Sequence, residues 1–144
     1  MVEDFEVAFL TRPPRGANKL LVLVDDGYEV EGPRLYRQFG NQRTDPGPRS
    51  PVELDVDGEF LGTLVSMAAV ERAHQIVDGV RLPVLTTGKG GLGESQHVLR
   101  IVADFTTVEF AWWSVLPDEW SALRPLLDHL ESLAKLFETD EPRR

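Results

Sequence analysis

Hydrophobic and polar residues alternate along much of the first two thirds of the chain, a period typical of β-strands. The opening segment, DFEVAFL, has Phe5, Val7 and Phe9 on one side and Glu6 and Ala8 on the other. This pattern predicts a strand with one buried face. The next segment, RPPRGAN, breaks the alternation and is expected to end the strand.

Two later segments predict β-hairpins. KLLVLVDDGYEVEG contains an apolar run, the pair Asp26-Gly27 and a second short alternating run, and VELDVDGEFLGTLV is arranged in the same way around Asp57-Gly58. Asp-Gly is favoured in the tight turns that join antiparallel strands. Between the two segments, residues 40–51 are polar or turn-forming, so we expect a long surface loop there.

The segment SMAAVERAHQIV is compatible with a helix, because Met67, Val70, His74 and Val77 recur at three- and four-residue spacing. Further on, Pro83 within VRLPVLTT indicates an edge strand or an irregular segment. The segments HVLRIVADF and VEFAWW then read as two more strands.

The last segment, PDEWSALRPLLDHLESLAKLF, has the period of an amphipathic helix. Its apolar stripe consists of Trp120, Leu123, Leu127, Leu130, Ala134 and Phe137. Proline is tolerated in the first turn of a helix but costs about 3 kcal/mol in its interior. Pro125 therefore predicts that the regular helix begins between Ser121 and Arg124, after a separate turn formed by PDEW. Residues 137–144 are expected to form a frayed tail.

Together these elements predict an α+β fold. We expect a curved, hairpin-rich antiparallel sheet of about six to eight strands, with the C-terminal amphipathic helix packed on one face. The 144 residues fit a single domain, 1–144.

Three tryptophans lie close together where the last strand meets this helix. Alternation along the strand assigns Trp112 to the core and Trp113 to the outer face, which also carries Glu109. Trp120 begins the apolar stripe of the helix and is expected to stack near Trp112. Two interpretations of Trp113 stay open: a loop covers it, or it is an exposed anchor for a partner.

The order VEFAWW, LPDEW and LRPLLDHL resembles the C-terminal end of small uncharacterised bacterial proteins of unknown function. The resemblance covers about residues 96–137. It implies the same strand-to-helix corner and no activity.

Composition narrows the classes of function. The net charge of −9 disfavours extended binding to nucleic acid, which depends on Lys and Arg, and is compatible with a basic protein partner. The chain has no cysteine, so disulfides, thiolate metal sites and a cysteine nucleophile are excluded. Its N-terminus does not resemble a signal peptide, and no apolar run is long enough to span a membrane. We therefore expect a cytoplasmic protein that binds neither nucleic acid nor membranes.

Motifs for catalysis are weak. GKGGLG resembles a phosphate-binding loop only in its glycines, because no Ser or Thr follows the lysine and the next residues read as a strand. The histidines, His74, His97 and His129, do not have the spacing of a metal site and are expected at the surface or its boundary. We assign no catalytic residue, metal or cofactor.

Two hypotheses of function follow. The first is a small non-enzymatic protein that binds another protein, as an inhibitor or a toxin-immunity protein. The residues assigned to this contact are Trp113, Arg34, Arg37 and Arg43. The alternative is a small-molecule-binding protein or enzyme, with a pocket between sheet and helix that is closed by the 86–95 loop. The loop residues assigned there are Lys89, Gly90 and Gly91. A self-associating subunit is a further alternative.

Overall fold

The computed structural model describes residues 5–25, 32–40, 60–83, 95–103 and 106–139. The described elements, in chain order, are β1 (Phe5–Arg12), β2 (Asn18–Asp25), β3 (Arg34–Gly40), β4 (Phe60–Leu64), α1 (Met67–Gly79), β5 (Gln96–Ala103), β6 (Thr106–Trp113), the 3-10 helix η1 (Asp118–Leu123) and α2 (Arg124–Thr139).

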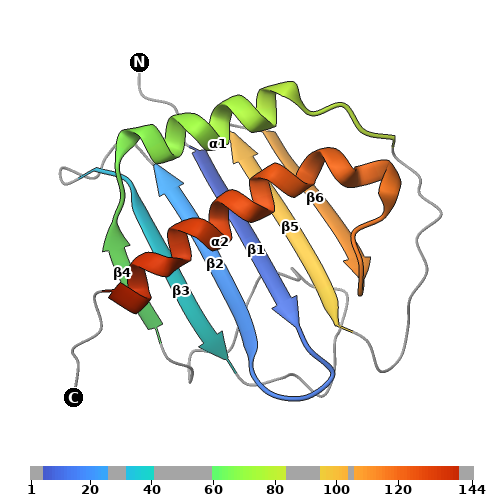
Figure 1. The fold of residues 1–144 in the computed structure, drawn as a ribbon, viewed down its shortest axis with the longest axis horizontal. Helices are drawn as coiled ribbons and strands as arrows, with labels where there is room; N and C mark the ends of the chain where they lie inside the picture. Colours follow the sequence, from blue (N-terminus) through green and yellow to red (C-terminus); the bar gives the residue numbers. More distant parts are fainter. Residues whose placement is uncertain (1–4, 26–31, 41–59, 84–94, 104–105, 140–144) are drawn as a thin grey trace.

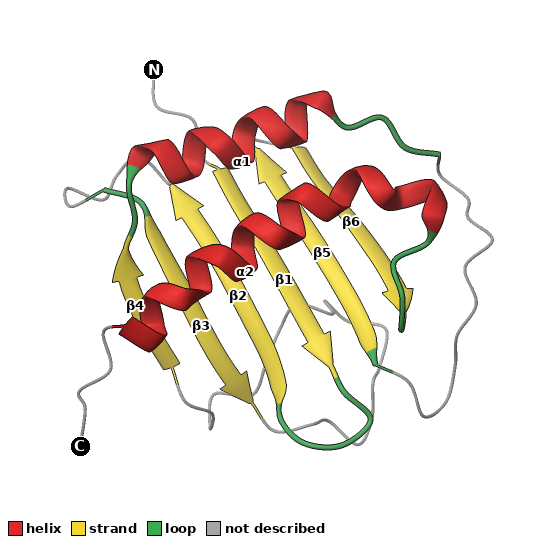
Figure 2. Ribbon diagram, in the orientation of Figure 1, coloured by secondary structure: helices red, strands yellow, loops and turns green. Residues whose placement is uncertain are grey.

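The strands form one curved antiparallel sheet in the order β4-β3-β2-β1-β5-β6. Both α-helices lie on the same face of this sheet, α1 near one end of the strands and α2 diagonally across them (Figure 1). The described elements therefore form two layers, and the second face of the sheet is covered by neither helix (Figure 2). The predicted α+β fold with a C-terminal helix on an antiparallel sheet is confirmed. The segment SMAAVERAHQIV is also a helix, α1.

The core fills the space between the helices and the sheet. In the centre, Val7 on β1 pairs with Leu23 on β2 and with Ile101 on β5, and all three are buried. The stripe predicted for the C-terminal helix packs against this surface through Leu123 at the end of η1 and through Leu127, Leu130 and Phe137 on α2. Leu126, which lies beside the stripe, is fully buried as well.

The central strands are buried on both faces. A second apolar cluster, Ala8, Leu10, Leu20 and Val98, lies on the face without helices. The sequence predicted only one buried face for β1, and this prediction is wrong. β1 lies between β2 and β5 in the middle of the sheet, where its second face also contributes to an apolar cluster.

Residues at the start of each α-helix favour helix formation at that position. The Ser66 side chain accepts a hydrogen bond from the Ala69 backbone N–H at 3.2 Å and so caps the first turn of α1. α2 begins at Arg124, which places Pro125 in its first turn, and the preceding residues form η1 instead of regular α-helix. The start predicted from Pro125 is confirmed.

The strand β3 lies in a segment that hydropathy did not identify as a strand. The partner of β2 was expected just after the pair Asp26-Gly27, but β3 begins only at Arg34. Arg34 and Arg37, one on each face of the strand, interrupt its hydrophobic pattern. The guanidinium of Arg37 stacks on the rings of Phe39 and Phe137, 5.2 and 5.0 Å from the two ring centres, so this arginine contributes to the packing beneath α2.

Three positions differ from what the sequence pattern alone indicates. Within the spacing that indicated a helix, Val70 is buried but Met67 is exposed, and α1 also buries Ala69 and Ala73. Val108 lies on the same side of β6 as Trp112 but is exposed, since β6 is an edge strand. A frayed tail was expected from residue 137, but Phe137 is buried and α2 continues to Thr139.

Several predictions fall outside the described residues. They are the Asp26-Gly27 and Asp57-Gly58 turns, the arm 52–56 of the second hairpin, most of the loop 40–51 and most of the segment 84–95.

Candidate functional site

The strand β6 forms one edge of the sheet, and within the described ranges it pairs only with β5. Its residues are exposed except for Phe110 and Trp112. The strand is eight residues long and rich in β-branched and aromatic side chains. A long exposed edge with this composition is a template to which another strand can add.

One hydrogen bond shows which backbone N–H and C=O groups of β6 point away from β5. The N–H of Ser114 donates to the carbonyl of Ser95 at 2.7 Å, so residue 114 points its backbone groups at β5. In an antiparallel pair this orientation alternates from residue to residue. The N–H and C=O groups that point away from the sheet therefore belong to Thr107, Glu109, Ala111 and Trp113.

The inner side of β6 is fixed by aromatic packing. Trp112 lies 6.0 Å from Phe9 and 6.4 Å from Trp120, measured between ring centres, and Phe110 packs on Trp120 at 5.3 Å. The indole N–H of Trp120 donates to the Pro83 carbonyl at 2.9 Å. Trp112 and Trp120 thus belong to the core, as predicted, and they hold the edge strand in place.

Trp113 points to the other face and is 39% exposed, whereas Trp112 is 6% exposed. Beyond it, Ser114 adopts a positive φ of 60° and the chain turns toward η1. Val115, just after this turn, is 73% exposed. Exposed apolar side chains therefore continue from the end of β6 into the following turn. Of the two interpretations of Trp113, the structure favours the exposed one.

One ionisable residue lies within β6, the exposed Glu109. Arg100 on β5 is its cross-strand neighbour, and the Arg100 Nε is buried without a hydrogen-bond partner. Next to the edge formed by β6, the face without helices thus carries one negative charge, on Glu109, and one positive charge, on Arg100.

His97 lies on the helix-covered face next to Trp112, with ring centres 5.6 Å apart. Its Nδ1 is 3.3 Å from the hydroxyl oxygen of Thr11. Burial lowers the pKa of His97 below its ordinary value of 6.5, and the charges of Arg124 and Lys19 act in the same direction. A hydrogen bond to the Ser114 backbone opposes this shift. At neutral pH the ring is therefore a neutral packing residue.

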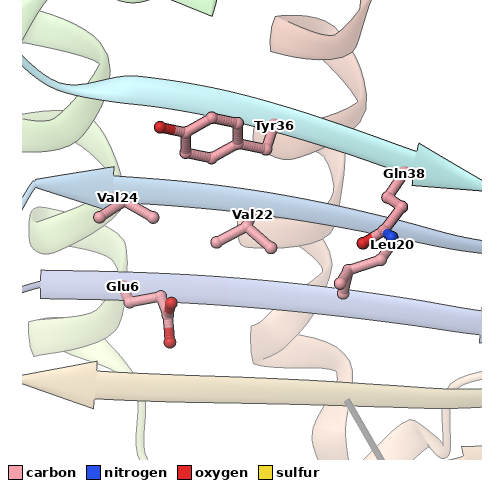
Figure 3. A pocket seen from close by; sticks show the side chains of 6 residues that line it. All are labelled: Glu6, Leu20, Val22, Val24, Tyr36 and Gln38. Carbon is pink, nitrogen blue, oxygen red and sulfur yellow. The ribbon is translucent and has the colours of Figure 1, made fainter. Parts of the chain in front are cut away.

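A hollow of about 280 Å³ lies on the sheet face without helices (Figure 3). Its lining residues come from β1, β2 and β3 and are Glu6, Leu20, Val22, Val24, Tyr36 and Gln38. The sequence hypothesis placed a pocket between sheet and helix, but this hollow lies on the opposite side of the sheet. Sequence reasoning missed it, because Tyr36 and Gln38 belong to the unrecognised strand β3.

The structure brings together few of the residues assigned to partner binding. Arg34 and Arg37 are three positions apart on β3 and therefore point to opposite faces. Arg37 packs beneath α2, and neither arginine shares an edge with Trp113. Arg43, Lys89, Gly90 and Gly91 lie outside the described residues.

The other histidines also have packing roles. His74 stacks on Phe5 at 4.4 Å, and His129 Nε2 donates to the Ala69 carbonyl at 2.8 Å, which links α2 to α1. Over the described ranges, no group of three His, Asp or Glu side chains is placed to hold a metal ion. None of the helices described is long and apolar enough to cross a membrane.

Comparison with known proteins assigns no relative. No protein-family model matches the chain, and no curated protein matches it.

Proposed function

We propose that this protein binds another protein, and that an extended segment of the partner adds to the sheet at the free edge of β6. The observation that carries the proposal is that β6, which ends in Trp113, lies at the edge of the sheet and pairs only with β5 among the described strands. In this mode of recognition, backbone hydrogen bonds provide affinity and side-chain contacts provide specificity.

The outward backbone groups and the exposed side chains belong to the same residues. Thr107, Glu109, Ala111 and Trp113 point their N–H and C=O groups away from β5, and their side chains lie on the face without helices. An added strand would hydrogen-bond to these four residues and pack a side chain against Trp113. Tryptophan is enriched among residues that dominate binding energy.

Charge favours a basic partner. A cationic residue of the added strand opposite Glu109 would form a favourable cross-strand pair. The net charge of −9 attracts a basic protein at longer range. An inhibitor or immunity protein that neutralises a basic toxin is the specific form of this proposal.

The test distinguishes binding at the β6 edge from binding elsewhere on the surface. Tagged wild-type protein and the variants Trp113→Ala, Ala111→Pro and Leu64→Ala are used to capture partners from the native cell. Proline at position 111 removes one outward N–H and leaves the hydrogen bonds to β5 in place. Leu64 is an exposed apolar residue on the opposite edge strand, β4, and serves as the matched control.

We expect one stoichiometric partner with the wild type and with Leu64→Ala, and its loss with the two β6 variants at unchanged melting temperature. Hydrogen exchange then adds a direct readout, since the amides of Glu109 and Ala111 should become protected in the complex. Equal capture by all four proteins would exclude β6 as the docking site. Recovery of chaperones alone would contradict the protein-binding function, and a doubled mass of the purified protein would identify a second copy as the occupant.

A further inference from the structure

The hollow on the sheet face without helices is built along one strand. Leu20, Val22 and Val24 alternate with residues that point into the main core, so their side chains form an aliphatic row along β2. Tyr36 and Gln38 on β3 lie opposite Val22 and Leu20. The floor is thus apolar, and the polar groups lie along its borders (Figure 3).

Two small residues leave this space open. A Cβ atom at Gly62 on β4 would come within 2.9 Å of the Tyr36 ring, so the ring rests against the Gly62 backbone. On the other side of β2, the residue opposite Val22 is Ala8, whose methyl group fills little volume. The hollow therefore depends on the absence of a side chain at position 62 and on a short one at position 8.

Glu6 provides a charge at one end. It lies on β1 opposite Val24, and its carboxylate forms no hydrogen bond or ion pair with any residue that the structure describes. Three cations of the described strands share this face: Arg34 lies opposite Val24 on β3, Arg100 lies on β5, diagonal to Glu6, and Arg12 lies at the other end of β1. None of them forms an ion pair with Glu6, so within the described ranges its negative charge is not neutralised by a protein cation.

We propose that this hollow binds a short alkylammonium group, with its hydrocarbon chain on Leu20, Val22 and Val24 and its ammonium at the Glu6 carboxylate. The volume of about 280 Å³ lies at the lower end of the range for ligand pockets, which suits one short chain. The aliphatic floor favours the hydrocarbon part, and Glu6 favours the cation. This site is independent of the β6 edge and of any partner bound there.

An alkylammonium group can belong to a free amine or to the lysine side chain of a peptide. Pentylammonium and Nα-acetyl-lysine N-methylamide distinguish them. Tighter binding of the first assigns the hollow to a small molecule, and tighter binding of the second assigns it to a lysine side chain. Either result supports the alkylammonium site.

The experiment is an NMR titration of the full chain with three probes that share one hydrocarbon chain: pentylammonium, pentanol and pentanoate. We expect the amides of Val22, Val24 and Tyr36 to shift, and pentylammonium to bind about fivefold more tightly than pentanol, the upper range for a partly exposed ion pair. Pentanoate should bind most weakly. Sodium chloride should reduce the preference for the cation, because salt screens exposed charges.

Two variants and one control locate the site. Glu6→Gln should abolish the preference for pentylammonium over pentanol and leave the binding of pentanol unchanged. Gly62→Ala should weaken all three probes, because the new methyl group displaces the Tyr36 ring. Glu109→Gln removes an exposed carboxylate from the same face at β6, outside the hollow, and should leave the affinity for all three probes unchanged.

Equal affinity for the three probes would overturn the proposal, as would a cation preference that survives Glu6→Gln. Shifts confined to residues outside the hollow, or the absence of any shift with pentylammonium, would overturn it too. The wild-type titration gives these results directly, so the proposal stays testable even if one variant fails to fold.

Discussion

Trp112 and Trp113 are neighbours in the sequence and lie in opposite environments. Trp112 packs against Phe9 and Trp120 beneath the helices, whereas Trp113 is partly exposed on the other face. The alternation of side chains along a strand accounts for the different sides. The different burial has another cause: both helices cover one face of the sheet, and β6 lies at its edge. The comparison separates residues that stabilise the fold from those available for binding.

The largest expected effect is that of Trp112→Ala. Removing a buried tryptophan typically costs about 3–5 kcal/mol, because apolar contacts are lost and a cavity remains. Urea denaturation should therefore show a large loss in the free energy of unfolding. A loss below about 1 kcal/mol would mean that Trp112 resembles a surface residue, and the contrast between the two tryptophans would disappear.

Arg37→Ala should have an intermediate effect, about 1–2 kcal/mol, because the guanidinium stacks on both Phe39 and Phe137. Arg72→Ala on the exposed side of α1 is the matched control and should change the stability by less than about 0.5 kcal/mol. If the two variants unfold at the same urea concentration, Arg37 does not contribute to the packing beneath α2.

His97 makes a smaller, pH-dependent contribution on the covered face. Burial lowers its pKa in the folded protein below 6.5, so the unfolded chain binds the proton first as the pH falls. Its contribution to stability is complete above about pH 6.5 and decreases as the pH falls through the lower pKa of the folded state. The free energy of unfolding of the wild type, relative to His97→Gln, should therefore decrease between pH 7.5 and pH 5. Parallel pH profiles would contradict this, and NMR titration of the His97 ring would measure the shift directly.

The smallest effect on stability is expected for Trp113→Ala, within about 0.5 kcal/mol, because Trp113 is an exposed residue on an edge strand. The same change should abolish partner binding. Thermal unfolding followed by circular dichroism provides the measurement. A loss comparable with that of Trp112→Ala would show that Trp113 is covered in solution, which was the other interpretation open at the sequence level.

Much of the fold could be predicted because its signals are local. The pattern in α2 fixed its buried stripe, and Pro125 fixed where the helix begins. The strand β3 could not be recognised in this way. Its residue Arg37 is polar in sequence, but it packs between aromatic rings from β3 and α2, and this contact exists only after folding.

The candidate site was less predictable than the fold. Trp113 was assigned to the outer face, but its exposure depends on β6 being an edge strand. The hollow combines residues of β1, β2 and β3 that are far apart in the sequence, and its shape depends on Gly62 on a fourth strand. The hydrophobic pattern within one segment cannot reveal a hollow that is formed by residues of several strands.

The sequence by itself determined the fold class, the start of the C-terminal helix and the sides of β6 that Trp112 and Trp113 occupy, because propensity, capping and alternation act over a few residues. The tertiary structure decided which strands lie at the centre and which at the edge, and which face of the sheet the helices leave uncovered. These features depend on the order of the strands and on contacts between distant segments. They determine which side chains are buried and which are available to bind.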